Sequence, residues 1–237
     1  MPMDGRLETG YLTLFSQTRM VRDLLHGFLP EEWIGWLDPG TLERRDGEGS
    51  TPDRPEGALV WRLRWQGGSD WVYLLLKTQA REDPFTALDL ELCRGLFYRA
   101  LLRRRRREVR LPAVLPVVLY GGEPPWSAPL DARELFLPLL PSLQRHVPQT
   151  RYLVLDAVNG PIPAAMGGDN LVSLLCELER SRTAEEVDPL LTRLAALLAV
   201  AGDEPLRRAW STFLGRFFLP RRFPGIFLLP EPEVVLP

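Results

Sequence analysis

Residues 58–77, ALVWRLRWQGGSDWVYLLLK, form the most informative stretch of this 237-residue chain. Two runs rich in leucine and aromatic residues, each with one valine, flank Gly67 and Gly68. Paired glycines favour a two-residue hairpin turn, because both turn positions need a positive φ. The pattern predicts an antiparallel hairpin in which the numbers of opposed residues add up to 135, so that Ala58 lies opposite Lys77 at the open end.

Side chains alternate between the two sides of such a ribbon. The side that we expect to face the core carries Leu59, Trp61, Leu63, Trp65, Val72, Leu74 and Leu76. The other side, where a functional edge would lie, carries Ala58, Val60, Arg62, Arg64, Trp71, Tyr73, Leu75 and Lys77. Lys77 is the only lysine of the chain, and its place at the end of an apolar strand needs an explanation.

Composition excludes several classes of protein. A hydrophobic content of 45% is enough for a globular core, and no apolar run approaches the roughly 20 residues that span a bilayer. The first residues show no signal peptide, so we expect a cytoplasmic protein with no membrane partner. Cys93 and Cys176 lack metal-ligand spacing and are expected to be buried, reduced thiols. A net charge of −2 means that any phosphate contact must be local.

The segments around the hairpin predict a mixed α/β core followed by a helical C-terminal half. Residues 8–28 predict one broken or two short helices, and residues 44–57 a surface loop. Asp83 and Pro84 predict the start of a helix with Phe85, Leu88, Leu92 and Leu96 at helical spacing. Further elements are expected as a strand at 114–120, a helix at 131–146, a strand at 151–158 and helices from residue 170, the second of which has Thr183 and Glu186 at capping-box spacing.

Several segments also resemble a known family, the YhgA-like transposases, also called Rpn recombination-promoting nucleases, of the PD-(D/E)XK nuclease superfamily. They are VRDLLHGFLPEEW, ALVWRLRW, VYLLLKTQA, LPAVLPVVLYGGEPPW, NLVSLLCELERS and LRRAW. The resemblance runs from about residue 8 to residue 222. It implies a restriction-endonuclease-like mixed sheet flanked by helices. Together with the pattern along the chain, this predicts a nuclease-like α/β core at 1–160, a helical region packed on that core at 161–222 and a proline-rich tail at 223–237.

The resemblance also implies a metal-dependent DNA endonuclease centre, and this chain departs from it at the decisive positions. The family's metal-binding Asp falls on Ala58 and its Glu falls on Lys77, whereas Gln79 is retained and Glu8 matches an N-terminal acidic residue. Carboxylates that converge on Mg²⁺ would position and activate the attacking water. An ammonium about 4 Å from a divalent cation repels it by several kcal/mol even at an effective dielectric constant near 20. No cofactor is therefore expected, or Mg²⁺ if the enzyme is active.

Three readings follow from these residues. In the first, a catalytically degenerate nuclease fold retains nucleic-acid or partner binding. In the second, an active Mg²⁺-dependent endonuclease has migrated carboxylates, Glu56 and Glu8, because Glu56 pairs with Gln79 in the same hairpin register. In the third, the chain is a non-enzymatic interaction module or a remnant of a mobile element.

The expected contacts to nucleic acid are cationic side chains on the hairpin and at the end of the following helix: Arg62, Arg64, Lys77, Arg103, Arg104 and Arg105. Two simpler roles compete with this one. Arg62 and Arg64 can stack on Tyr73 and Trp71 across the hairpin, and the arginine run suits the negative end of a helix dipole. DNA is the expected partner, no small-molecule substrate is expected, and whether the chain forms a homodimer is left open.

Overall fold

The structure is a computed structural model that describes residues 3–29, 32–45, 58–68, 70–104, 110–137, 140–163, 169–201 and 203–223. The chain forms two compact units. Unit 1 comprises Met1–Gly35, Gly121–Pro125 and Asp156–Pro237, and unit 2 comprises Trp36–Tyr120 and Trp126–Leu155. The predicted mixed α/β fold with helices in the C-terminal half is confirmed.

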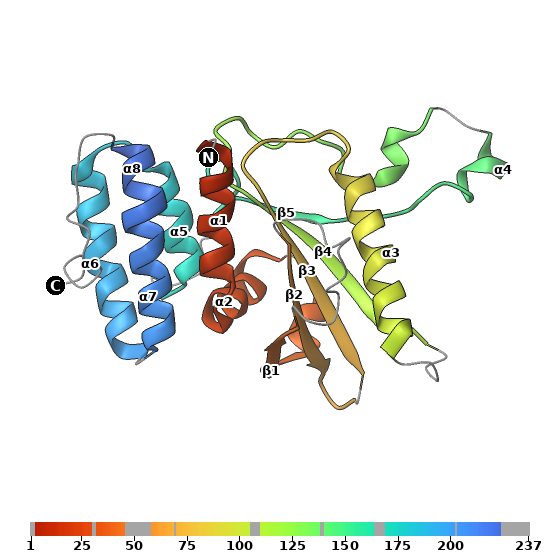
Figure 1. The fold of residues 1–237 in the computed structure, drawn as a ribbon, viewed down its shortest axis with the longest axis horizontal. Coiled ribbons are helices and arrows are strands. Elements are labelled where there is room, and N and C mark those ends of the chain that lie inside the picture. The colour runs from red at the N-terminus through yellow and green to blue at the C-terminus, as the bar shows by residue number, and fades with distance from the viewer. Residues whose placement is uncertain are drawn as a thin grey trace. The chain divides into compact units, whose positions relative to one another are not determined.

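Unit 2 is built on a five-stranded mixed sheet with the strand order β1-β2-β3-β4-β5. Its strands are β1 (Leu37–Arg44), β2 (Ala58–Trp65), β3 (Trp71–Gln79), β4 (Ala113–Tyr120) and β5 (Leu153–Asp156). β1, β2 and β3 pair antiparallel, whereas β3 and β4 pair parallel. A parallel pair needs a crossover connection, and helix α3 (Thr86–Arg104) supplies it and lies along the sheet (Figure 1).

The predicted hairpin register is confirmed residue by residue. Ala58 pairs with Lys77, Val60 with Leu75 and Arg64 with Trp71. The turn is wider than predicted, because the strands end at Trp65 and resume at Trp71, and Gly67 is the one described residue with a positive φ, at 75°. The Trp65 amide donates to the Asp70 carbonyl (3.1 Å), which keeps the predicted register across this wider turn.

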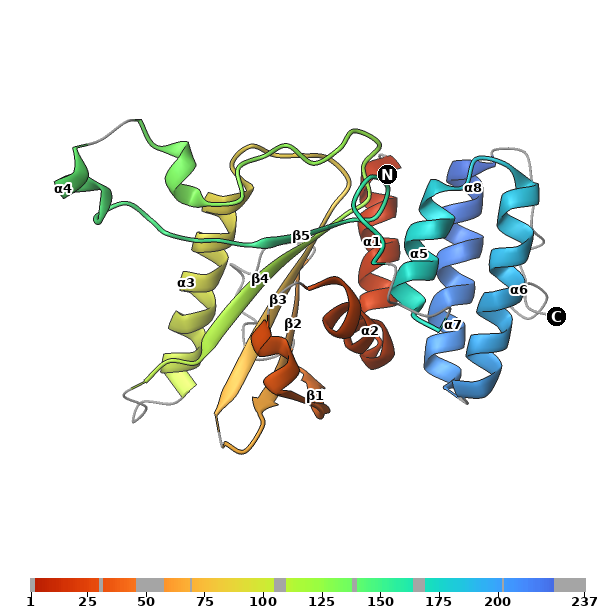
Figure 2. The same cartoon turned by 180° about the vertical axis from the view of Figure 1, so that it is seen from behind.

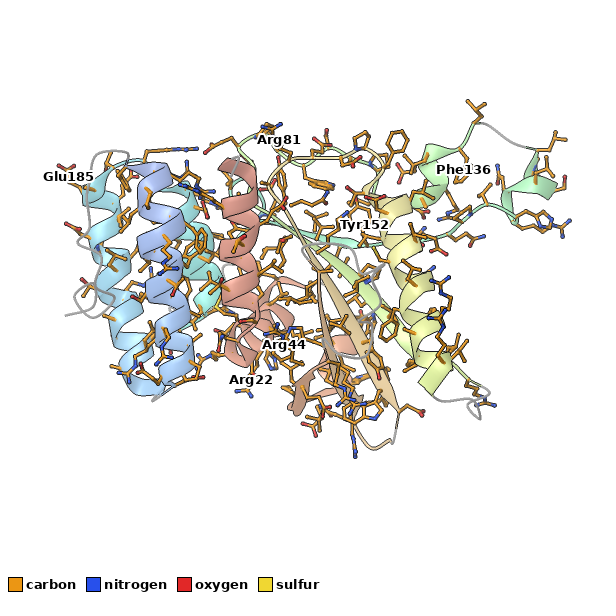
Figure 3. The ribbon with its side chains drawn as sticks, viewed as in Figure 1. Arg22, Arg44, Arg81, Phe136, Tyr152 and Glu185 are labelled. Carbon is orange, nitrogen blue, oxygen red and sulfur yellow. The ribbon has the colours of Figure 1, made fainter. Side chains whose placement is uncertain are left out.

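The prediction that one side of the ribbon faces the core is incomplete, because both sides are buried. Leu63 and Leu74 on the expected core side are fully buried. On the other side Ala58, Val60, Tyr73 and Leu75 join a second core cluster with the α3 residues Ala87, Leu90, Cys93, Phe97 and Leu101. Figure 3 shows Tyr152, another member of this cluster, beside the sheet. The expected functional edge is thus covered by α3, except near its ends.

Strand β1 was not predicted from the sequence. It contains Pro39 and Gly40, which disfavour a strand interior, and its pairing with β2 is irregular between Asp38 and Glu43. Proline is tolerated at a sheet edge because one side of an edge strand needs no amide donor. β1 is an edge strand in this sheet, so the prolyl residue fits there.

The helix predicted at 131–146 is wrong. This segment forms the 3-10 turn η2 (Ala132–Leu135) and, separately, the short helix α4 (Pro141–Gln144). Proline lacks an amide donor and is accepted only in the first turn of a helix, and Pro141 begins α4. The Asp131 carboxylate starts η2 by accepting from the Arg133 amide (2.9 Å), and it binds the guanidinium groups of Arg133 (2.6 Å) and Arg151 (2.8 Å).

Replacing Asp131 by Asn should keep the cap but lose the two charge-assisted bonds. Hydrogen bonds from Arg133, more than those from Arg151, hold the pKa of Asp131 well below its usual range. We expect the free energy of unfolding to fall by about 1 kcal/mol at pH 7, because both arginines are partly exposed. A lowered pKa stabilises the fold above the usual Asp value near 3.9 and loses this effect as the pH falls through the lowered value. Urea unfolding from pH 7 to pH 3 should show the wild-type advantage shrinking below about pH 4, and a constant difference would contradict the assignment.

Unit 1 is helical. It contains α1 (Met3–Phe15), α2 (Thr18–Phe28), α5 (Leu171–Arg180), α6 (Ala184–Ala201), α7 (Glu204–Thr212), the π-helical η3 (Phe213–Phe218) and α8 (Leu219–Arg222). The two predicted N-terminal helices are therefore confirmed. α1 packs against α7, and α5 against both α2 and α6 (Figure 2). The Glu186 amide and the Thr183 hydroxyl are hydrogen-bonded (3.3 Å), as the predicted capping box requires.

Two further expectations concern the whole chain. Cys93 and Cys176 are both buried and free, as predicted. Within the part of the chain that the structure describes, no helix is long and apolar enough to span a membrane. The 3-10 turn η1 (Glu32–Trp36) follows α2 in the chain and precedes β1. The loop predicted at 44–57 begins too early, because Arg44 is the last residue of β1, and residues 46–57 lie outside the described residues.

Candidate functional site

The open end of the β2–β3 hairpin is the position where the family resemblance puts a metal. Strand pairing places Ala58 directly opposite Lys77, and Gln79 follows on the same side of β3 because side chains alternate along a strand. The structure therefore brings three of the five predicted catalytic positions together. We call Ala58, Lys77 and Gln79, with the residues of α3 that contact them, the hairpin corner.

Lys77 is paired with Asp89, an acid that was not predicted from the sequence to lie at this corner. Its Nζ lies 3.1 Å from Oδ2 of Asp89, in the first turns of α3. The Lys77 side chain is only 13% exposed, whereas that of Asp89 is half exposed. The pair is charge-assisted and leaves Lys77 little contact with solvent. An acid in the first turn of a helix is common for reasons of the helix dipole, so its sequence position gave no sign of this role.

Gln79 is committed to a structural contact. Its side-chain nitrogen lies 3.2 Å from the hydroxyl of Thr86, which in turn donates to the carbonyl of Asp83 (2.7 Å). The Asp83 carboxylate accepts from the Phe85 amide (2.8 Å), so the predicted cap residue shapes the turn just before α3 rather than the helix itself. Gln79 and Thr86 are both buried. These bonds fix the first turn of α3 against the end of β3.

The surroundings of Ala58 are apolar. Ala58 is buried in the cluster that includes Tyr73, Ala87 and Cys93. Burial raises the pKa of the Cys93 thiol to about 11, and the nearby ammonium of Lys77 only partly opposes this. A methyl side chain supplies no ligand, and a thiol with so high a pKa is protonated and does not bind a hard cation at neutral pH.

The residues of the hairpin corner do not fit a magnesium ion. Among the described residues of the hairpin corner, Asp89 alone carries a carboxylate, and this carboxylate is bonded to Lys77. In the described ranges, no group of three or more His, Cys, Asp or Glu side chains could hold a metal. Mg²⁺ needs several oxygen ligands in octahedral geometry, and the corner offers an ammonium where the cation would lie.

The two acids of the alternative, active site lie outside the described part of unit 2. Glu8 lies on α1, which belongs to unit 1, whereas the hairpin belongs to unit 2. Glu56 lies outside the described residues. The alternative of migrated carboxylates therefore stays a prediction.

The predicted cationic residues separate into two groups. Arg62 and Arg64 both lie over the ring of Trp71, at 4.0 and 4.7 Å from its centroid. The predicted stacking of Arg64 on Trp71 is therefore confirmed. The prediction for Arg62 is wrong in its partner, because Arg62 stacks on Trp71 and not on Tyr73. Arg62 is also paired with Glu43 of β1 (2.6 Å). Arg103 is exposed near the end of α3, which closes at Arg104, and Arg105 lies outside the described residues.

The exposed hairpin end also carries aromatic side chains. Trp36, largely exposed, meets Trp65 edge to face with ring centroids 5.5 Å apart. Arg64 is exposed, and within the described part of the chain it makes no ion pair. Its guanidinium thus has one face on Trp71 and its polar edge toward solvent. We call Arg62, Arg64 and Trp71 the arginine–tryptophan stack.

Unit 1 holds a second charged cluster, built around a fully buried carboxylate, that the sequence did not reveal. The side chain of Glu179 on α5 is fully buried, and Arg221 of α8 donates to its carboxylate. The guanidinium of Arg222 donates from one amino group to the Glu179 carbonyl and from the other to the Glu123 carboxylate (2.6 Å). Burial raises the pKa of Glu179 against the opposing effect of the two arginines. This cluster links α5 to α8 and is best understood as structural.

One of three comparisons with known proteins identifies the family of the chain. The family model described as "Putative transposase, YhgA-like" matches residues 11–204. No curated protein matches the chain. No solved structure matches it either. The matched range includes the hairpin, α3 and β4 and covers well over half of the 237 residues, and on this ground the chain belongs to the YhgA-like transposase family.

Proposed function

We propose that this member of the YhgA-like transposase family is a DNA-binding protein that does not cleave DNA. The observation that carries the proposal is the ion pair between Lys77 and Asp89 at the hairpin corner. The resemblance implies a carboxylate at position 77, and Lys77 supplies the opposite charge, already neutralised by the acid of α3. With Ala58 opposite it, the described residues of the corner supply no set of oxygen ligands through which a metal could activate water.

The arginine–tryptophan stack is the surface that we assign to DNA. An arginine held over an indole ring is positioned in advance, so that less side-chain entropy is lost when it binds a phosphate. Strand β2 carries Arg62 and Arg64, and Arg45 follows strand β1, against the acids Asp38 and Glu43 of β1. Arg44 pairs with Trp61 and therefore lies on the other side of the sheet. The surface is therefore only locally basic, which agrees with a chain of net charge −2. Binding should be weak, independent of metal and sensitive to salt.

A binding experiment tests this assignment. Fluorescence anisotropy with a labelled duplex in EDTA should give saturable binding at low salt that is lost as the salt concentration rises. Arg64→Ala should weaken binding several-fold and lower the slope of log K against log salt by about one, as expected for one lost phosphate contact. Arg208→Ala removes the same charge from an exposed position on α7 of unit 1 and is the matched control.

Two results would contradict the proposal. Equal effects of Arg64→Ala and Arg208→Ala would show that the stack is not the contact surface. An absence of binding at low salt would favour the reading of the chain as an interaction module for another protein.

A further inference from the structure

Helix α3 has an apolar stripe that the fold of unit 2 does not use. The helix packs on the sheet through Ala87, Leu90, Cys93, Phe97 and Leu101. Other apolar residues that the sequence places at helical spacing are exposed: Leu88 (43%) and Leu92 (63%) on the helix, and Phe85 (59%) in the turn just before it. Several large side chains exposed in a row along one helix are unusual for a surface that faces only water.

The stripe continues along the helix with the spacing of a helix–helix contact. After Leu88 and Leu92 it passes through Gly95, where an added Cβ would meet nothing within 4 Å, and through Arg99 to Leu102, which is 42% exposed. From Phe85 to Leu102 the steps alternate between three and four residues. This is the spacing that keeps one face of a helix against a partner helix at a shallow crossing angle. The stripe is about 26 Å long at 1.5 Å per residue.

We propose that this stripe is the interface of a homodimer in which α3 packs antiparallel against α3 of a second copy of the chain. A two-fold axis near the middle of the stripe places Leu92 of one copy against Gly95 of the other. The most exposed leucine of the stripe thereby meets the one position that has open space in place of a side chain. The same axis sets Leu88 against the aliphatic stem of Arg99, and Phe85 against Leu102.

The charges beside the stripe select the antiparallel arrangement. The half nearer the start of α3 is flanked by Asp89 and Glu91, whose side chains are 50% and 34% exposed; Asp89 is bonded to Lys77, and Glu91 to Arg94 and Thr150. The half nearer the end carries Arg99 within the stripe and Arg103 beside it, both exposed. An antiparallel pair brings the acidic half of each copy beside the basic half of the other, whereas a parallel pair sets like charges together. An isologous contact of this kind closes as a dimer and goes no further.

A single helix pair is a small interface, so the dimer should dissociate on dilution. Sedimentation velocity over a range of concentrations should show a mass that rises from one chain, 27.0 kDa, toward two. Leu92→Glu puts a charge at the centre of the stripe on an already exposed position, so it should not disturb the fold, and it should weaken dimerisation at least 100-fold. Leu143→Glu makes the same change on α4, outside the stripe, and should leave the mass unchanged.

Cross-linking tests the orientation. Chains with Phe85→Cys and chains with Leu102→Cys are mixed and oxidised, while the two native cysteines stay buried. The antiparallel dimer should give disulfides only between the two kinds of chain, because like positions lie about 25 Å apart in that arrangement. Disulfides between like chains would overturn the antiparallel dimer. A mass of one chain at every concentration, or equal loss of the dimer in Leu92→Glu and Leu143→Glu, would overturn the proposed interface.

Discussion

Replacing Glu179 by Ala should lower the free energy of unfolding of the helical unit by about 3 kcal/mol or more. The substitution leaves the guanidinium of Arg221 largely buried beside an empty space, and an uncompensated buried charge costs about 3–5 kcal/mol. Arg222 loses less, because it retains its bond to Glu123. Urea unfolding followed by far-UV circular dichroism measures the change, since unit 1 is helical.

Two control variants separate the buried charge from the contact itself. Glu123→Ala removes an exposed carboxylate that binds Arg182 and Arg222, and it should cost less than about 1 kcal/mol. Glu179→Gln keeps the side-chain volume and one acceptor oxygen, and its loss of free energy of unfolding should fall between those of Glu179→Ala and Glu123→Ala. If Glu179→Ala were no more harmful than Glu123→Ala, the cluster of Glu179 and Arg221 would not be what links α5 to α8.

The second large effect is expected at the hairpin corner. A double variant with Ala58→Asp and Lys77→Glu should be less stable than the unmodified protein without metal, by about 1–3 kcal/mol, because the first substitution puts a carboxylate into an apolar cluster and the second sets a carboxylate against that of Asp89. Three carboxylates at one corner supply what Mg²⁺ or Mn²⁺ needs. Adding either metal at 100 times its dissociation constant should raise the free energy of unfolding of the double variant by about 2.7 kcal/mol.

The neutral pair Ala58→Asn and Lys77→Gln is the matched control for this variant, because it changes size and polarity in the same places without adding charge. Thermal unfolding of the unmodified protein and of the control should not depend on Mg²⁺ or Mn²⁺. Metal-dependent stabilisation of the unmodified protein would show that a cation site exists which Ala58 and Lys77 do not block.

The part of the fold that the sequence predicts well is local in the chain. The hairpin register follows from a turn centred on Gly67 and Gly68, and the pairing of Ala58 with Lys77 could be found because the wider turn of the structure keeps that centre. Gly67 and the Thr183–Glu186 box are likewise read from a few neighbouring residues.

The elements and contacts that could not be predicted from the sequence depend on contacts between segments far apart in the chain. β1 is a strand because it pairs with β2, and its own residues Pro39 and Gly40 indicate otherwise. Asp89 contacts Lys77 only because α3 packs over the hairpin. Glu179 and Arg221 are in contact although they are 42 positions apart in the chain. The spacing of Phe85, Leu88 and Leu92 predicted a helix correctly but not which side of it the sheet would cover, because Ala87 and Leu90 lie at the same spacing.

We propose that the hairpin corner of this family member does not support metal-dependent cleavage. The test is nicking of supercoiled plasmid in Mg²⁺ or Mn²⁺ by the unmodified protein, by the Ala58→Asp and Lys77→Glu double variant and by its neutral control, all at equal purity. We expect plasmid to stay supercoiled with the unmodified protein and the control, and to be nicked only by the double variant. Metal-dependent nicking by the unmodified protein, retained after Lys77→Ala and lost after Glu56→Ala or Glu8→Ala, would contradict the account.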